Sequence, residues 1–197
     1  MKFIHGASVP VVKATCTPAF GSKKLDITIQ DGKHSGPKCV QLVADYLLSF
    51  ECLRYLVLPF KQLIYNSQMN DPYQGGLTSY ALVLMIVAFL QMKVYNKMPT
   101  EVKSPNLGVL FIEFLSYYSN LDYMATEIKP LAPEKEIITP PFSATQGDSA
   151  PNSILVVDPL NPLNNVARST YKFHFLKVAR GNLGRIYFLS HSSRLFL

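Results

Sequence analysis

Residues 75–90 read GGLTSYALVLMIVAFL and contain the longest apolar run of the sequence. Its apolar run from Tyr80 to Leu90 is too short to cross a bilayer, which takes about 20 residues. A glycine pair and a Thr-Ser pair precede the run, and both are typical of a turn that leads into a capped helix. We therefore predict a buried helix over residues 78–94.

The turn before this helix allows two interpretations. Backbone N–H groups and the dipole at a helix N-terminus favour anions, so Gly75-Gly76 would make a seat for phosphate. Ser79 would add a hydroxyl donor, and the flat ring of Tyr80 would stack on a base. The alternative is an ordinary capped helix with a core tyrosine, and the local pattern leaves both open.

Apolar residues recur at helical spacing on both sides of this segment. We predict further helices at about residues 40–48, 53–67 and 107–119. Pro59 should kink the second of these or shift its start, because proline removes a backbone donor and clashes with the preceding turn. Ser104-Pro105-Asn106 is a start signal for the third.

The N-terminal part has a period of two instead. Residues 8–14 and 24–30 are predicted strands, and the turn residues between them predict a β-hairpin. Leu25 and Ile27 then share one face of the second strand, and Asp26 projects away from that apolar layer. An isolated hairpin is marginal in water, so we expect that further chain completes the sheet.

The C-terminal third begins with a proline-rich segment. Residues 129–153 show little periodicity, which predicts a surface loop or a partly disordered excursion. A short strand over residues 154–157 and a polar loop follow. The end, from about residue 169 to residue 189, is predicted to be helical, although Gly181 and Gly184 weaken it.

Composition permits several functions. The chain has 197 residues, of which 48% are hydrophobic and 16% charged, as in one globular domain or one domain with a fragment. The net charge of +6 suits a polyanionic partner or a phosphate-bearing ligand, and an ordinary basic protein carries the same charge. The cysteines and histidines lack the paired spacing of a tetrahedral zinc site.

Three ordered blocks carry a family resemblance. The first combines YLVL at residues 55–58, Lys61-Gln62, Asn70, the run 75–80 and FLQ at residues 89–91. The second is LGVLFIEF at residues 107–114, and the third is DPLNPLNNVARSTY at residues 158–171. Together they resemble the non-canonical poly(A) polymerases of the DNA-polymerase-β-like nucleotidyltransferase superfamily, above all the nuclear TRAMP-type enzyme. The second block is similar to the helix of the PAP-associated domain, and the third to the nucleotide recognition motif.

The resemblance covers about residues 9–187 and implies an α+β fold. Residues 35–197 would form a mainly helical central and PAP-associated domain, with the proline-rich loop at about residues 129–153. Residues 1–34 would be a β-hairpin remnant of the nucleotidyltransferase palm sheet, so that the chain is N-terminally truncated. The nucleotide would bind in the cleft between the two parts.

The family roles of these positions imply a nucleotide-binding site. Lys61 and Ser79 would hold the triphosphate, and Tyr80 would stack on the base. The Asn164-Asn165 loop would read the base edge.

Two further residues would support that loop. The motif implies that Asp158 and Arg168 brace it, with Asp158 buried or paired with Arg168. Uridine-adding relatives commonly carry a histidine here, and none lies between these two positions, which favours ATP over UTP as substrate. An asparagine amide offers a donor and an acceptor, as the adenine edge requires.

The catalytic metal site is incomplete in this sequence. The family chemistry needs Mg²⁺ (or Mn²⁺) held by an Asp-x-Asp pair after Gly-Ser and by a third carboxylate on a neighbouring strand. Asp26 matches that third catalytic and metal-binding position, and nothing matches the first two. Gly21-Ser22 is interpreted as hairpin-turn chemistry. One carboxylate cannot hold two magnesium ions, so we predict that the isolated chain does not polymerise.

The sequence therefore predicts a template-independent RNA 3′-adenylyltransferase, a poly(A) polymerase of nuclear RNA processing and surveillance, without its Asp-x-Asp segment. The alternatives are a catalytically inactive nucleotide- or RNA-binding pseudoenzyme or docking module, and a uridylyltransferase when completed. The resemblance implies the RNA 3′ end, a zinc-knuckle RNA-binding protein and an RNA helicase as partners, no membrane, and a nuclear or also cytoplasmic location. An in-frame Gly-Ser and Asp-x-Asp encoded upstream of Met1 would favour the polymerase, and a stop codon there the pseudoenzyme.

Overall fold

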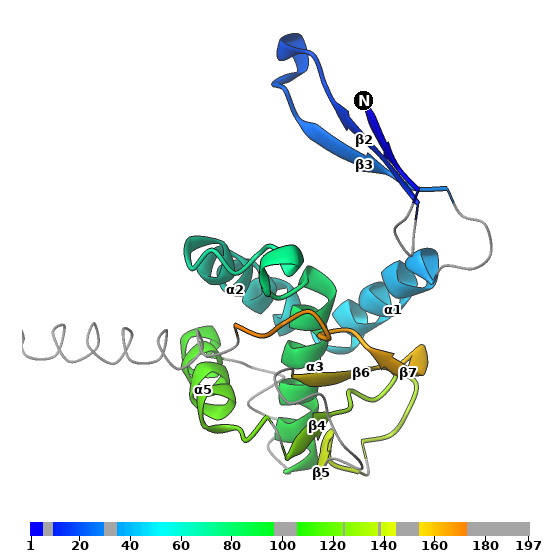
Figure 1. The fold of residues 1–197 in the computed structure, drawn as a ribbon. Helices are drawn as coiled ribbons and strands as arrows, with labels where there is room; N and C mark the ends of the chain where they lie inside the picture. The colour runs from blue at the N-terminus through cyan, green and yellow to red at the C-terminus, as the bar shows by residue number, and fades with distance from the viewer. Residues whose placement is uncertain are drawn as a thin grey trace, which may run out of the picture. The chain divides into compact units, whose positions relative to one another are not determined.

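A computed structural model describes residues 1–5, 10–29, 35–96, 106–123, 125–137, 139–144 and 154–172. The chain divides into two compact units, residues 1–41 and 42–197, whose elements are drawn in Figure 1. The predicted α+β class is confirmed, because helices occur together with two small sheets. The assignment of residues 1–34 and 35–197 to different domains stays a prediction.

The first unit contains a three-stranded antiparallel sheet in the order β1-β2-β3. Strand β1 spans Lys2–Ile4, β2 spans Val11–Thr15 and β3 spans Lys24–Ile27. The pairing of β2 with β3 confirms the predicted hairpin, whereas β1 is a third strand that the sequence did not indicate. A 3-10 turn at Pro18–Phe20, followed by Gly21 with φ of 73°, closes the hairpin.

Strand β3 has no buried side chain. Leu25 and Ile27 are 45% and 48% exposed, so the residues that the structure describes do not form the expected apolar layer beneath them. Asp26 faces Lys13 across the β2–β3 pair, and its Oδ2 lies 2.9 Å from the lysine Nζ.

The helices begin and end close to their predicted bounds. They are α1 (Gly36–Ser49), α2 (Cys52–Asn66), α3 (Ser79–Tyr95) and α5 (Leu107–Asn120). The division between the two units falls within α1. Pro59 is exposed and lies inside α2, which begins one residue before its predicted start, so the proline does not end the helix.

Helix α3 is the centre of the second unit. Every residue from 81 to 91 is buried, which explains why the run is apolar without a helical period. The side chains of α2 and α5 meet beside it, where the rings of Phe60 and Phe114 lie 4.2 Å apart between centroids. The Tyr118 hydroxyl of α5 donates a hydrogen bond to the Met85 carbonyl of α3 at 2.8 Å. These contacts join α2 to α5 and α5 to α3.

The second sheet has the order β5-β4-β6-β7, and β6 packs against α3 (Figure 1). Its strands are β4 (Thr126–Ile128), β5 (Phe142–Ala144), β6 (Leu155–Asp158) and β7 (Asn161–Asn165). Only β4 and β6 pair in parallel. Strand β6 confirms the predicted strand at residues 154–157, and β7 lies where a polar loop was expected.

The described part of the proline-rich segment, residues 129–137 and 139–144, is not a free surface loop, which differs from the prediction. It contributes strand β5, and its Leu131 backbone is held by two buried helix side chains. Gln91 Nε2 donates to the Leu131 carbonyl at 2.7 Å while Gln91 Oε1 accepts from the Leu131 N–H at 2.9 Å. The Tyr46 hydroxyl donates to the same carbonyl at 2.8 Å. Residue 138 and residues 145–153 lie outside the described ranges.

The predicted C-terminal helix is not found where the structure can test it. Residues 166–169 form turns and residues 170–172 are irregular. The remainder of the predicted helix, residues 173–189, lies outside the described residues. Across the parts of the chain that the structure describes, every helix is too short or too polar to cross a membrane.

Candidate functional site

The glycine turn before α3 uses its backbone donors internally. The N–H groups of Gly75 and Gly76 donate to the carbonyls of Pro72 and Asp71, at 3.2 and 2.9 Å. Leu77 N–H donates to the Met69 carbonyl at 2.8 Å. The two glycine amides therefore do not form the phosphate seat that the sequence suggested.

The helix start itself shows a side-chain cap. Thr78 is the N-cap residue, and its Oγ1 accepts from Ala81 N–H at 3.1 Å. Ser79 follows as an exposed residue, and Tyr80 is half-buried with its hydroxyl directed at the second sheet. The Tyr80 hydroxyl donates to Asp158 Oδ1 at 3.0 Å, which joins positions 78 residues apart in sequence.

Asp158 is the centre of a polar network at the end of β6. Only 2% of its surface is exposed. Its Oδ1 also accepts from Leu160 N–H at 3.0 Å, and its Oδ2 accepts from Asn164 Nδ2 at 3.1 Å. A buried carboxylate is tolerated when its oxygens are hydrogen-bonded in this way. Asp158 thereby ties the β6–β7 turn to the first turn of α3.

Residues 158–168, which resemble part of the nucleotide recognition motif, are called the recognition loop below. Its asparagines Asn164 and Asn165 have different hydrogen-bond partners. Asn165 Oδ1 accepts from the N–H groups of Val156 and Ala167, at 3.1 and 2.9 Å, and its Nδ2 donates to the Ile154 carbonyl at 2.9 Å. Its amide therefore braces the loop rather than facing a ligand. Asn164 is half-buried and donates through Nδ2 to Asp158.

Arg168 does not take the place that the motif implied. Its side chain is exposed. Among the described residues, Asp158 accepts hydrogen bonds from Tyr80, Leu160 and Asn164 and not from Arg168. The expected pairing of Asp158 with Arg168 is therefore replaced by a bond to a tyrosine. The expectation that Asp158 is buried is fulfilled.

Lys61 lies on the outer face of α2. Its neighbour Phe60 and the next inward residue, Ile64, are buried, which leaves the Lys61 side chain exposed to solvent. Tyr65, one helical turn further on, is exposed too. The contacts of the described residues do not join Lys61 to Ser79.

Burial around the network also affects a tyrosine of α1. Tyr46 is fully buried, and burial raises its pKa above the usual range, with further contributions from the charges of Glu134 and Asp158. Tyr46 is therefore a neutral hydrogen-bond donor near Asp158 at physiological pH.

The described residues do not form a metal centre. Asp26 has 57% of its side chain exposed and is paired with Lys13, a cation that competes with a metal for the same carboxylate. Nowhere in the described ranges do three or more His, Cys, Asp or Glu residues gather as a metal site would require. The donor set present does not fit a two-metal centre.

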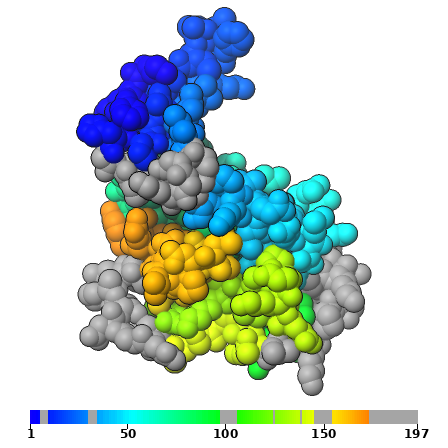
Figure 2. All heavy atoms as spheres, turned by 90° about the vertical axis from the view of Figure 1, so that its right-hand side faces the viewer, coloured from blue at the N-terminus to red at the C-terminus, as the bar shows by residue number. Residues whose placement is uncertain are grey.

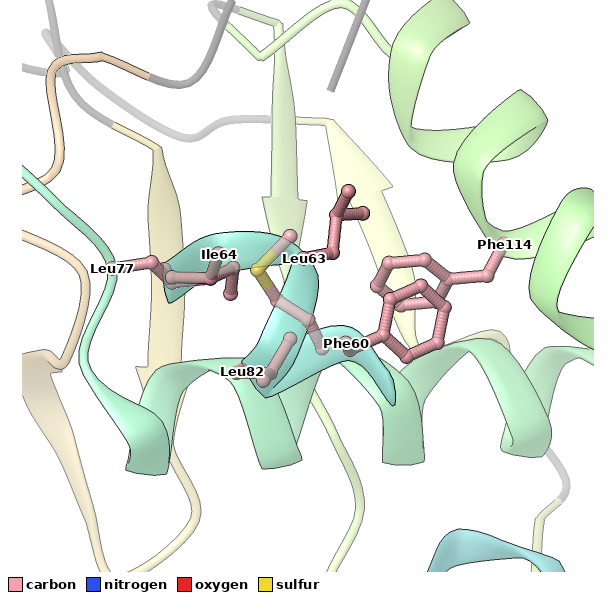
Figure 3. Close-up of a pocket in the computed structure, with 7 residues that line it drawn as sticks. Phe60, Leu63, Ile64, Leu77, Leu82 and Phe114 are labelled. Atoms are coloured by element: carbon pink, nitrogen blue, oxygen red, sulfur yellow. The ribbon is translucent and has the colours of Figure 1, made fainter. Parts of the chain in front are cut away.

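Two cavities of the second unit are lined by residues outside this network. One is a void of about 10 Å³ in the apolar core, too small for a nucleotide, between Phe60, Leu77 and Phe114 (Figure 3). The other is an open groove of about 430 Å³ between α3 and α5, lined in part by Phe89, Lys93 and Glu113. Neither is lined by a predicted site residue.

Figure 2 shows residues 154–172, in orange, at the surface beside residues 125–144.

Two contacts of the site were missed by sequence reasoning. The hydroxyl of the buried Thr170 donates to the Gly76 carbonyl at 3.1 Å, and the ring of Tyr171 lies against Gly75. The only sequence signal was the glycine pair itself, since adjacent glycines often mark a close approach by another segment.

The sequence is similar to curated poly(A) RNA polymerases. It is 33% identical over 168 residues to the inactive non-canonical poly(A) RNA polymerase protein Trf4-2 of Drosophila melanogaster, covering 84% of this chain and 40% of that protein. It is 31% identical over 187 residues to poly(A) RNA polymerase gld-4 of Caenorhabditis elegans, covering 92% and 21%. For poly(A) RNA polymerase protein 2 of Saccharomyces cerevisiae the identity is 28%, over 91% and 30%. The chain thus spans less than half the length of each of these relatives, and no family model matches it.

Solved structures share the fold. The polymerase core of TRAMP, an RNA surveillance complex, superposes with a TM-score of 0.72 at 23% identity, covering 92% of this chain and 55% of that one. The Cid1 poly(U) polymerase, solved with magnesium and 3′-dATP, gives 0.64 at 20% identity, covering 91% and 63%. The chain therefore has the architecture of part of these polymerases.

Proposed function

We propose that this chain, which is similar in sequence to poly(A) RNA polymerases and has the fold of part of one, is the nucleotide-binding helical part of a template-independent polymerase that adds adenylate to RNA 3′ ends. The observation that carries the proposal is the Tyr80–Asp158–Asn164 network. It places an aromatic ring at a helix N-terminus beside an asparagine loop, with a buried carboxylate holding both.

Each residue of the network has a role in this proposal. The ring of Tyr80 stacks on the base, since every base has a flat face that an aromatic ring can cover. The Oδ1 of Asn164 accepts a hydrogen bond from the exocyclic amine of adenine, while Asn164 Nδ2 is held by Asp158. Asn165 and Asp158 are positioning residues rather than base readers.

The triphosphate is assigned to the exposed side chains. Ser79 supplies a hydroxyl at the positive end of the α3 dipole, and Lys61 supplies an ammonium charge. Arg168, exposed at the end of the recognition loop, is a second cation available to the nucleotide.

A divalent metal is part of the proposed chemistry of the whole polymerase. In a complete polymerase, Asp26 would hold Mg²⁺ or Mn²⁺ only together with the Asp-x-Asp carboxylates that this sequence does not contain, and the chemistry such a metal supplies is charge neutralisation. Asp26 is the residue of this chain assigned to it, and it is insufficient by itself because magnesium needs several oxygen ligands. We propose that this chain binds ATP and does not catalyse transfer alone.

Two alternatives have their own observations. An inactive binding module is favoured by the absence of Asp-x-Asp from the sequence and by the Lys13–Asp26 ion pair, and one relative is named as inactive. Uridylyl transfer is consistent with the shared fold of the Cid1 poly(U) polymerase, but the recognition loop carries asparagine and no histidine.

The same proposal includes partners and location. The RNA 3′ end is the acceptor, and a zinc-knuckle RNA-binding protein and an RNA helicase are the proposed partners in a nuclear complex. The TRAMP polymerase core, which has the same fold, is part of an RNA surveillance complex, and this supports RNA as the acceptor and membership of a complex.

Calorimetric titration of the full chain with ATP tests the proposal. Base stacking is worth about 1–3 kcal/mol, so Tyr80→Ala should weaken ATP binding about fivefold to 150-fold. The matched control is Tyr73→Ala, which removes another tyrosine, 89% exposed and seven positions earlier, and should leave the affinity unchanged. Absence of saturable binding, or equal losses in the two variants, would refute the proposed nucleotide site.

A further inference from the structure

The recognition segment is attached to the start of α3 at a second place. The carbonyls of Gly75 and Gly76 both accept hydrogen bonds from residues that follow β7. Thr170 Oγ1 donates to the Gly76 carbonyl at 3.1 Å, and Lys172 N–H donates to the Gly75 carbonyl at 3.2 Å. Thr170 is fully buried, so solvent water does not compete for the hydrogen bond of its hydroxyl.

The Tyr171 ring completes this attachment. Gly75 has φ of 79°, and a Cβ added there would overlap the Tyr171 ring. A glycine is therefore required at this position both by the backbone conformation and by the close approach of the ring. We name residues Thr170, Tyr171 and Lys172 with Gly75 and Gly76 the glycine clasp.

The clasp and the Tyr80–Asp158 bond enclose the recognition loop. Asp158 holds the beginning of the loop to the first turn of α3, and Thr170 holds its end to the turn just before that helix. Asn164 lies between these two attachments. Its position relative to Ser79 and Tyr80 is consequently fixed at both ends of the loop.

We propose that Thr170 and Tyr171 are positioning residues that hold Asn164 at base-reading distance from Tyr80. This inference rests on the proposed nucleotide site. Ser79 and Lys61 lie outside the clasp, so the clasp should affect recognition of the base and not retention of the phosphates.

Replacement of one hydroxyl provides the test. Thr170→Val keeps the branched shape and removes the donor, and should weaken ATP binding about twofold to tenfold, the effect of one lost hydrogen bond. The affinity for inorganic triphosphate, measured by competition, should not change. Thr170→Ser restores the donor and should restore ATP affinity, and Ser169→Ala is the matched hydroxyl deletion one residue earlier.

Hydrogen–deuterium exchange of the same variants gives an independent readout. Thr170→Val should accelerate exchange at the Leu160, Val166 and Ala167 amides without affecting the middle of α3. Tyr171→Ala, at a half-exposed side chain, repeats the test should the buried substitution prevent folding.

The outcomes separate the two claims. If the wild-type chain binds no ATP, the proposed function fails, and exchange alone then decides whether the clasp holds the loop. If the wild type binds but Thr170→Val binds ATP equally well, or loses ATP and triphosphate equally, the clasp inference is wrong while the nucleotide site stands.

Discussion

Asp158 shows how a single buried carboxylate organises the candidate site. It accepts hydrogen bonds from an α3 tyrosine, a turn amide and a loop asparagine, with almost no exposed surface. Removing an acceptor from such a group leaves donors unsatisfied, which costs more than the net worth of one hydrogen bond. Asp158 therefore has a structural role beside the proposed nucleotide site.

Asp158→Asn should destabilise the chain by about 1–3 kcal/mol, because one oxygen becomes an NH₂ group that faces donors. Urea unfolding followed by circular dichroism measures the difference. Asp26→Asn is the matched control, since its ion pair is at the surface and such pairs contribute about 0–1 kcal/mol. Equal effects of the two substitutions would show that the network does not stabilise the fold.

At the scale of elements, α5 and the turn after it concentrate buried tyrosines. The Tyr118 hydroxyl donates to Met85 and that of Tyr123 donates to the Tyr118 carbonyl. Burial raises the pKa of Tyr117 to about 12, and it raises the pKa of Tyr118 and Tyr123 above that of an exposed tyrosine. All three are neutral donors or neutral rings at physiological pH.

This burial predicts a loss of stability in alkali. A raised pKa means that the folded state holds the phenolic proton more tightly than the unfolded state does. The contribution of these tyrosines to the free energy of unfolding should therefore be constant below the unfolded pKa of about 10 and fall as the pH rises from there toward about 12. Urea midpoints against pH measure it. Tyr117→Phe should reduce the slope of that fall, and a rise of stability with pH in this range would contradict the assignment.

The helices could be predicted from the sequence more fully than the strands could. The helices were predictable because glycine, proline and asparagine mark their starts and apolar residues repeat within them. Strand β7 was not, because NPLNN has no apolar alternation and pairs with β6 through an irregular register. The attachment of Leu131 was also hidden, since it depends on Tyr46 and Gln91, far away in sequence.

The site was only partly predictable for a related reason. A motif resemblance selected Tyr80, Asp158 and Asn164, which the structure brings into one network. The resemblance could not show that the Asn165 side-chain amide is engaged in hydrogen bonds within the loop. Its partners are backbone groups, which every sequence provides. Thr170 was missed because its acceptor is a glycine carbonyl.

At the scale of the whole molecule, the residues proposed for nucleotide binding and for catalysis belong to different units. The Tyr80–Asp158–Asn164 network lies within the second unit, whereas Asp26, the carboxylate proposed to hold a metal, lies in the first. Purified chain with ATP, magnesium and an oligo(A) primer should leave the primer length unchanged on a sequencing gel. Extension that is abolished by Asp26→Ala would overturn this prediction.

Photolabelling with 8-azido-ATP reports which residues lie beside the base of a bound nucleotide. If the base binds between Tyr80 and Asn164, labelling should be saturable, suppressed by unmodified ATP and located on peptides that contain Tyr80 or residues 158–168. The label should be lost in Tyr80→Ala but not in Tyr73→Ala. Labelling confined to other peptides, or labelling that excess ATP does not suppress, would contradict this position of the base.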